Sequence, residues 1–381
     1  MRTFYFDHAA TTAVREEVLQ EMLPYFSLCY GNPSSLYTIG REAKIGLTTA
    51  RNRVAQAIGC KEKEIYFTGC GSESDNLAIK GYGRANKEKG NHIITTKIEH
   101  PAVLHTCQAM EKEGYEVTYL GVNADGSISL EELENAITKR TILISIMFAN
   151  NEVGTIEPIK EIAKIAKEHK IVFHTDAVQA VGNVKINVQD MGIDMLSMSA
   201  HKFYGPKGVG ALYIKEGLKV DKIQDGGHQE RDKRAGTENV AEIVGEGKAI
   251  ELITKEQEIY NEKLMILRDY YIQEVKKRIP NCKVNGGIEN RLAGNANISF
   301  LGIEASDLLL KLDEKGICAS SGSACSSGSA KPSHVLLALG LSKEEAAGAL
   351  RISFGRENTK EDVDYLLQML ERSVEELRGN V

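Results

Sequence analysis

The sequence predicts an α/β protein: a large domain with a mostly parallel sheet flanked by helices, plus a smaller α+β domain at the C-terminal end. Two observations support this prediction. Between about residues 64 and 215, short apolar runs alternate with amphipathic helical patterns, which is typical of a parallel sheet covered by helices. After Gly245 the alternation stops, and a long charged helical stretch is followed by short strands and further helices.

Five runs predict strands of the large domain. Those at 64–68, 92–96 and 141–148 are rich in β-branched and aromatic residues, and 116–122 alternates between polar and apolar side chains. Residues 171–174 form a shorter run of the same kind. Runs that are apolar throughout indicate strands buried between helices on both faces of the sheet.

Helical patterns lie between and after these strands. Ser129 and Glu132 predict a capping box at the start of one helix, and an apolar stripe at 159–166 predicts another. A long helix is predicted for residues 247–277, because the pattern ends shortly before Pro280.

The domain division follows from this change of pattern. We predict an N-terminal segment, residues 1–14, that packs with the small domain, a large domain over 15–250 and a small domain over 251–381. Within the small domain, strands are predicted at 297–300 and 350–354, followed by a charged helix.

Composition excludes several classes of protein. Of the 381 residues, 42% are hydrophobic and 26% are charged, as in globular chains, and the formal net charge of −6 favours neither nucleic acid nor a membrane surface as a partner. No run approaches the ~20 apolar residues of a membrane helix. The seven cysteines are scattered without a C-x-x-C pair, so we expect a reduced, cytoplasmic protein.

Lys202 is the first candidate catalytic residue. It follows the apolar run 194–198, where a strand is predicted to end, and ligands of α/β sheets gather at the carboxyl ends of strands. A lysine with apolar neighbours can lose its proton and form a Schiff base with a carbonyl compound. The alternative is an ordinary solvated lysine in a loop.

Asp176 follows the buried run 171–174, where a carboxylate needs a partner. A pyridinium nitrogen would supply that partner, and the alternative is a capping role at the start of a helix. His169 and His174 lack a third residue at metal-ligand spacing, so no metal site is predicted.

Residues 67–77 combine a strand end, a glycine turn and a helix start, an arrangement whose backbone N–H groups bind anions such as phosphate. The glycines match neither the P-loop nor the dinucleotide-binding pattern. Cys325 lies in a Gly/Ser-rich segment, 320–329, for which we expect a mobile loop with a reactive thiol. The alternative is a surface linker with an incidental cysteine.

Together these segments resemble cysteine desulfurases of the NifS/IscS type, fold-type-I transferases that use pyridoxal 5′-phosphate (PLP). The resemblance covers nearly the whole chain. Besides the segments above, it is carried by residues 7–12, 31–35, 99–100, 150–154, 234–239 and 351–356.

The resemblance implies a role for each site residue. Lys202 would hold PLP covalently and move the Cα proton of the substrate, Asp176 would pair with the ring nitrogen, and His100 would stack on the ring. Asn151 and Gln179 would bond near the 3′-oxygen of the ring. The phosphate would be bound by Gly71, Ser72, Ser199 and His201, and by Thr237 reaching across from the neighbouring subunit of a homodimer.

The implied reaction converts L-cysteine to L-alanine. Arg351 would clamp the substrate carboxylate, with Asn151 also in the substrate site. The Cys325 thiolate would attack the substrate sulfur and become a persulfide, which an acceptor protein would receive: an iron–sulfur scaffold or a tRNA-thiolation enzyme. Rival interpretations are an aminotransferase or selenocysteine lyase with the same cofactor, and a non-catalytic sulfur carrier or scaffold partner.

Overall fold

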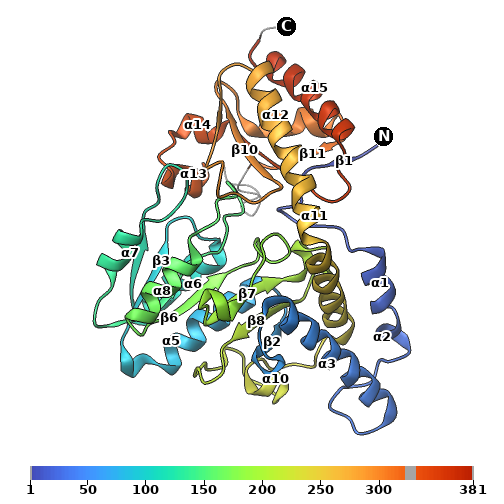
Figure 1. Cartoon of the computed structure of the whole chain (residues 1–381), viewed down its shortest axis with the longest axis vertical. Coiled ribbons are helices and arrows are strands. Elements are labelled where there is room, and N and C mark those ends of the chain that lie inside the picture. Colours follow the sequence, from blue (N-terminus) through green and yellow to red (C-terminus); the bar gives the residue numbers. More distant parts are fainter. Residues whose placement is uncertain (1, 322–331, 380–381) are drawn as a thin grey trace.

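Figure 1 shows the computed structural model of the chain, which describes residues 2–321 and 332–379. Over these residues, the largest sheet has seven strands in the order β2-β8-β7-β6-β5-β3-β4. Neighbouring strands from β7 to β4 are parallel, while β8 runs antiparallel to β2 and β7. The predicted mostly parallel α/β sheet is thus confirmed. The strands are β2 (Ile65–Thr68), β3 (His92–Thr96), β4 (Glu116–Leu120), β5 (Thr141–Ser145), β6 (Val172–Asp176), β7 (Met195–Ser199) and β8 (Gly210–Ile214).

Helices cover both faces of this sheet. Adjacent residues of a strand point to opposite faces, and Ile93 and Ile94 accordingly belong to two different hydrophobic clusters. The Ile94 face packs against α1 (Glu16–Met22), α3 (Thr38–Ile58), α7 (Leu130–Ala136), α8 (Ile159–Glu168), α9 (Val188–Met191) and the first part of α11 (Val240–Arg278). The Ile93 face packs against the helical turns η2 (Leu77–Gly81), α5 (Tyr82–Ala85) and α6 (Pro101–Lys112).

Shorter helical segments complete the part of the chain around the large sheet. They are α2 (Pro24–Ser27), η1 (Glu62–Glu64), α4 (Gly71–Asn76), η3 (Lys87–Lys89), η4 (Ala200–Lys202) and α10 (Gln229–Asp232).

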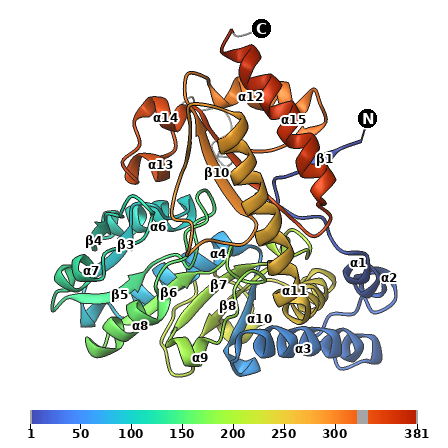
Figure 2. The ribbon, with the colours of Figure 1, turned by 45° about the horizontal axis from the view of Figure 1, so that its top comes forward.

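A smaller group of elements packs around its own hydrophobic cluster, above the large sheet in Figure 2. Its antiparallel sheet has the order β12-β10-β9, and β1 of the N-terminal segment pairs in parallel with β11. The elements are β1 (Phe4–Tyr5), β9 (Cys282–Val284), β10 (Asn295–Phe300), α12 (Ala305–Asp313), β11 (Ile317–Cys318), β12 (Ala349–Ser353) and α15 (Lys360–Leu377). The helices α13 (His334–Ala338) and α14 (Lys343–Ala347) pack instead into a separate cluster that includes Ile98 and Met147.

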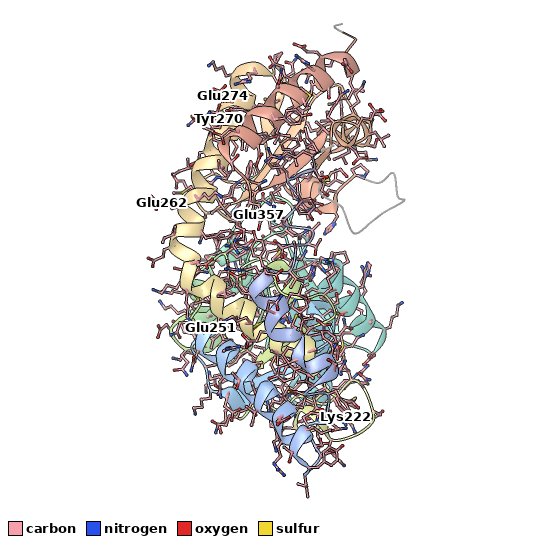
Figure 3. All side chains as sticks on the ribbon, turned by 90° about the vertical axis from the view of Figure 1, so that its right-hand side faces the viewer. Lys222, Glu251, Glu262, Tyr270, Glu274 and Glu357 are labelled. Atoms are coloured by element: carbon pink, nitrogen blue, oxygen red, sulfur yellow. The ribbon has the colours of Figure 1, made fainter. Side chains whose placement is uncertain are left out.

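The long helix α11 joins the two groups. Ile250 packs into the cluster of the large sheet, whereas Leu264 packs into that of the small sheet. Figure 3 shows α11 running along one edge of the molecule, from Glu251 beside the large sheet to Glu274 beside the small one. The predicted division between residues 250 and 251 falls inside this helix, and we propose it as the domain boundary.

Three of the local differences from the sequence predictions have a clear physical reason. Helix α11 begins at Val240 rather than near residue 247, because its first turns already pack Ile243 against the large sheet. Strand β8 was not predicted, since its short run follows a glycine-rich turn. Only half of the capping box forms: the Ser129 side chain accepts from the Glu132 N–H, but the Glu132 carboxylate accepts from the Gly121 N–H instead.

Within the described ranges, every helix is too short or too polar to cross a bilayer.

Candidate active site

A cavity of about 580 Å³ lies at the carboxyl ends of the parallel strands, where α/β sheets bind ligands. Its walls come from both groups of elements, because the strand ends and helix starts of the large sheet meet Arg351 of β12. The sequence-predicted residues that line it are Gly71, Ser72, His100, Asn151, Asp176, Gln179, Ser199, His201, Lys202 and Arg351.

Lys202 lies in the turn η4, directly after the buried strand β7. Its Nζ donates to the backbone oxygens of Ala9 and Ala10, at 2.6 and 2.8 Å. Both carbonyls belong to the N-terminal segment. The amine is therefore held at the cavity wall by a part of the chain that is remote in sequence.

Asp176 is the last residue of β6, and its Oδ1 accepts from the Val178 N–H at 2.9 Å. Burial raises the pKa of its carboxyl group, while His100 and Lys202 act in the opposite direction. A buried carboxyl group in such a cavity is suited to a cationic partner, such as a protonated ring nitrogen.

Gln179 lies in the turn after β6 and donates its Nε2 to the Ala9 oxygen at 2.9 Å. Because Lys202 donates to the same oxygen, Ala9 connects the two side chains. The Gln179 side chain thus helps to fix the N-terminal segment beside the cavity.

His100 precedes α6, and its Nδ1 accepts from the Ala102 N–H at 3.1 Å. This contact fixes the ring and places the proton of the neutral form on Nε2. Burial lowers the pKa of His100, so the ring is neutral near pH 7. A neutral, flat ring is suited to stacking on an aromatic ligand.

Gly71 and Ser72 form the first turn of α4, directly after β2 and its glycine turn. A Cβ atom at Gly71 would lie 2.6 Å from Cγ2 of Val178, so the close approach at this position requires glycine. N–H groups of a first helical turn lack intrahelical acceptors and are available to an anion.

Ser199 and His201 add two polar groups to the cavity wall at the end of β7. Nδ1 of His201 is hydrogen-bonded to the Thr11 hydroxyl at 3.0 Å. Burial, followed by the charges of Lys202 and Lys207, lowers the pKa of His201 to about 4. A neutral His201 can donate a hydrogen bond to an anion without adding charge.

Arg351 brings its guanidinium group from β12 and is only 1% exposed. Its Nη2 donates to Asp7 Oδ1 at 2.7 Å and its Nη1 to the Asn151 oxygen at 3.0 Å. Among the residues that the structure describes, its buried Nε has no hydrogen-bond acceptor. That donor is available to the carboxylate of a bound amino acid.

Six further titratable residues, to which the sequence assigned no role, line the cavity: Cys70, Asp75, Glu99, His105, Glu152 and His334. Burial raises the pKa of all three carboxyl groups. Four of them lie in segments that the sequence singled out: Cys70 and Asp75 in 67–77, Glu99 beside His100, and Glu152 in 150–154. His105 and His334 reach the cavity through tertiary packing, for which no local pattern exists.

Two predicted residues are not part of this wall. Thr237 is exposed and lies outside the cavity lining. Cys325 lies in 322–331, outside the described residues, so the predicted loop at 320–329 is described only at 320 and 321. In the described part of the chain, His, Cys, Asp and Glu do not gather in threes around a possible metal site.

Comparison with known proteins identifies the family. Residues 4–366 match the family described as aminotransferase class-V. The cysteine desulfurase IscS of Clostridium botulinum is 57% identical over 376 residues, which cover 98% of this chain and 95% of that protein. The cysteine desulfurase IscS of Methanosarcina thermophila is 56% identical over 378 residues, which cover 99% and 93%.

Solved structures agree with this comparison. A NifS-like protein has a TM-score of 0.93 and 37% identity, over 99% of this chain and 100% of that one. SspA in complex with cysteine has a TM-score of 0.84 and 39% identity, over 94% of this chain and 100% of that one. The chain therefore belongs to the class-V aminotransferase family and, within it, to the PLP-dependent cysteine desulfurases.

Proposed function

We propose that the protein removes sulfur from L-cysteine, leaving L-alanine, and collects the sulfur as a persulfide on Cys325. The observation that carries this proposal is that Lys202, Asp176 and Arg351 line one cavity although they come from distant elements. An amine, a buried carboxyl group and a guanidinium group are what a PLP enzyme needs for attachment, ring charge and substrate carboxylate.

The cavity fits PLP in size and chemistry. About 580 Å³ is in the range that holds a drug-sized ligand. The buried carboxyl group of Asp176 matches a ring N–H⁺, and the backbone N–H groups of the helix start at Gly71 and Ser72 match a phosphate. When bound, PLP withdraws electrons from the amino acid and so weakens bonds at its Cα and Cβ atoms.

The residues of the chain then bind the substrate and move its protons. Arg351 binds the carboxylate and so fixes the orientation of Cα. Lys202 takes the Cα proton at Nζ, and the carbonyl groups of Ala9 and Ala10 stabilise the resulting ammonium form. His100, held by its bond from the Ala102 N–H, covers the ring and keeps a proton at Nε2.

We assign the sulfur transfer to Cys325. Its thiolate attacks the substrate sulfur, so that an S–S bond forms and the C–S bond breaks, and the electron pair of the C–S bond stays on the substrate carbon. That carbon takes up a proton and becomes the methyl group of alanine. Cys70 lines the cavity as a second thiol, so an experiment must distinguish the two.

Mass spectrometry after brief exposure to L-cysteine tests this assignment. We expect one added sulfur atom on the peptide that contains Cys325. A Cys325→Ser variant should keep the yellow colour of bound PLP but release no sulfide, whereas the control Cys70→Ser should release sulfide normally. Unchanged sulfide release by Cys325→Ser would contradict the proposal.

We further propose a homodimer, in which Thr237 reaches the cofactor phosphate of the second copy. Large apolar side chains are exposed on α1, α2, the segments that connect α1 to α2 and α2 to α3, and the first half of α3, and such an exposed patch is typical of an interface. They are 39% to 88% exposed: Leu19, Leu23, Phe26, Leu28, Tyr30, Leu36, Tyr37 and Ile45. A Phe26→Glu/Leu28→Glu variant should sediment as a monomer, and a control Ile259→Glu on α11, also exposed, should remain a dimer.

The acceptor of the sulfur is, in our proposal, a protein of the cytoplasm: an iron–sulfur scaffold or a tRNA-thiolation enzyme. Relatives at 57% and 56% identity are named cysteine desulfurase IscS, which supports cysteine as the source of the sulfur that such an acceptor would receive. Isotope-labelled sulfur loaded from cysteine should pass to one of these acceptors when each is mixed with the enzyme, and passage to neither would contradict this assignment.

A further inference from the structure

The turn α10 contains three consecutive non-glycine residues with left-handed backbone. The φ angles are 45° at Glu230, 54° at Arg231 and 65° at Asp232. Side chains with a Cβ atom rarely adopt this region, and almost never in succession. Surrounding contacts must therefore hold the turn in this conformation.

A buried ion pair supplies the strongest of these contacts. Arg51 of α3 donates Nη2 and Nη1 to the two carboxylate oxygens of Glu230, at 2.6 and 2.7 Å. The two side chains are only 7% and 3% exposed. Glu230 also accepts from the Phe67 N–H at 2.9 Å, so its carboxylate is tied to β2 as well as to α3.

Arg231 and Arg234 connect the same segment to β2 and to the first turn of α4. The Arg231 guanidinium group lies over the Tyr66 ring, 4.2 Å from its centre. Arg234 donates to Glu73 at 2.8 Å, and Glu73 belongs to the first turn of α4, beside the predicted phosphate site. These contacts hold the segment against α3, β2 and α4.

Thr237 lies five residues after the end of this turn. Thr237 is exposed and lines no part of its own chain's cavity. The turn packs against Arg51 in the second half of α3 (Figure 1), and Ile45 of the same helix belongs to the apolar face of the proposed dimer. A rigid base and an exposed end are the features of an arm that serves another subunit.

We propose that the Arg51–Glu230 ion pair holds the 229–232 turn in its left-handed conformation so that Thr237 is presented to the cofactor phosphate of a second copy. Arg51 and Glu230 are positioning residues, because they act through Thr237. This inference rests on the homodimer of the proposed function, and it adds that a strained turn in one subunit sets cofactor affinity in the other.

Asp232 offers a test that leaves the core untouched. Its side chain is 61% exposed and bonded to His228 at 2.5 Å. Asp232→Val disfavours a φ of 65°, whereas the control Asp232→Gly accepts it, and both variants lose the His228 contact equally. Asp232→Val should bind PLP at least about tenfold more weakly in equilibrium dialysis, and Asp232→Gly should bind it normally. Equal affinities would overturn the proposal.

Mixed dimers test whether the turn acts on the other subunit. Asp232→Val is co-expressed with Lys202→Ala, each chain carrying its own tag. The Asp232→Val subunit keeps its lysine and receives an intact arm, so each mixed dimer should regain one site of normal PLP affinity. A mixed dimer without such a site would overturn the proposal while leaving the dimer intact. Sedimentation of the unmodified holoprotein as a monomer would overturn both the proposal and the homodimer.

Glu230→Gln gives an independent measurement on the ion pair itself. The variant should lose PLP affinity and should regain one normal site in mixed dimers with Lys202→Ala, as Asp232→Val does. If its soluble dimers bind PLP normally, the ion pair does not position the arm. Should Glu230→Gln be insoluble, Arg51→Lys replaces it: a lysine keeps the charge but cannot bond to both carboxylate oxygens, so it should show the same loss of PLP affinity and the same recovery in mixed dimers.

Discussion

Asp7 and Arg351, which are 344 residues apart in the chain, form an ion pair of 2.7 Å at the cavity. A β-bridge between Asp7 and Ser353 brings the N-terminal segment beside β12. Two residues later, the Ala9 oxygen accepts from the Lys202 amine. The same short segment therefore orients both the group proposed to bind the substrate carboxylate and the group proposed to move the substrate proton.

Replacing Arg351 by Ala should raise the KM for L-cysteine by about 10- to 100-fold, because a charged hydrogen bond to the carboxylate contributes ~1.5–3 kcal/mol. Asp7→Asn is the matched control, since it removes the same ion pair but keeps the guanidinium group. Steady-state kinetics of both variants check the prediction. A KM that rises equally in both would mean that the ion pair, and not a substrate contact, causes the effect.

Lys202→Ala should abolish the absorbance of covalently bound PLP and all desulfurase activity, because no other residue supplies an amine at that position of the cavity wall as described. Lys207→Ala is the control: Lys207 is exposed and lies five residues later, outside that cavity lining. The visible spectrum and sulfide release of the two purified variants are compared. A Lys202→Ala protein with normal activity would remove the lysine from the mechanism.

Local patterns were sufficient to predict residues at strand ends. Lys202, Asp176 and Gly71 each follow an apolar run closely, and the carboxyl ends of parallel strands meet at one edge of a sheet. The pattern and this rule together place the three near one another, and the structure has all three in one cavity wall. Their chemical roles stay predictions until the variants are measured.

Contacts between distant segments could not be predicted in this way. Nothing near Ala9 indicates that its carbonyl group accepts from a lysine 193 residues later. Asp75 follows a glycine turn and reads as an ordinary helical carboxylate, although it is 1% exposed in the structure. His334 follows a Gly/Ser-rich segment, and only the packing of α13 brings it to the cavity. Tertiary packing, and not local sequence preference, decides whether such residues reach the cavity.

Glu246 makes stability depend on pH. It is fully buried in α11, and neither carboxylate oxygen has a hydrogen-bond donor among the described residues. Burial raises its pKa from the ordinary 4.5 to about 8. The folded state therefore binds the proton more strongly than the unfolded state, so stability falls as the pH rises from about 4.5 to about 8.

The variant Glu246→Met places an apolar side chain of similar length at this position and should remove the fall in stability with rising pH. Its stability advantage over the unmodified protein should grow by up to ~1.4 kcal/mol per pH unit between those limits, measured by urea unfolding. Glu251→Gln is the control on the same helix (Figure 3). Hydrogen bonding to Lys255 lowers the pKa of Glu251, so its small contribution is present at neutral pH and lost in acid. An advantage of Glu246→Met that is constant with pH contradicts the prediction.

Asp75 and Asp176 are two buried carboxyl groups in one cavity wall, and burial raises the pKa of both. Burial, and then the charge of Asp176, raises the pKa of Asp75 well above its ordinary value. His174, whose Nε2 lies 3.7 Å from Asp75, offers no counter-charge because burial lowers its pKa to about 3. His100 and Lys202 favour the charged form of Asp176 instead. We therefore assign the proton to Asp75 and the charge to Asp176.

This assignment predicts opposite outcomes for two identical substitutions. Asp75→Asn has the shape of the protonated acid, so kcat should stay within about threefold of normal and the pH titration of bound PLP absorbance should keep its midpoint. Asp176→Asn removes the charge that faces the ring nitrogen and should lower kcat by about 100-fold or more, the equivalent of ~3 kcal/mol. A titration midpoint shifted by about one pH unit or more in Asp75→Asn would contradict the assignment, because exchanging one neutral group for another removes no net charge from the surroundings of the ring.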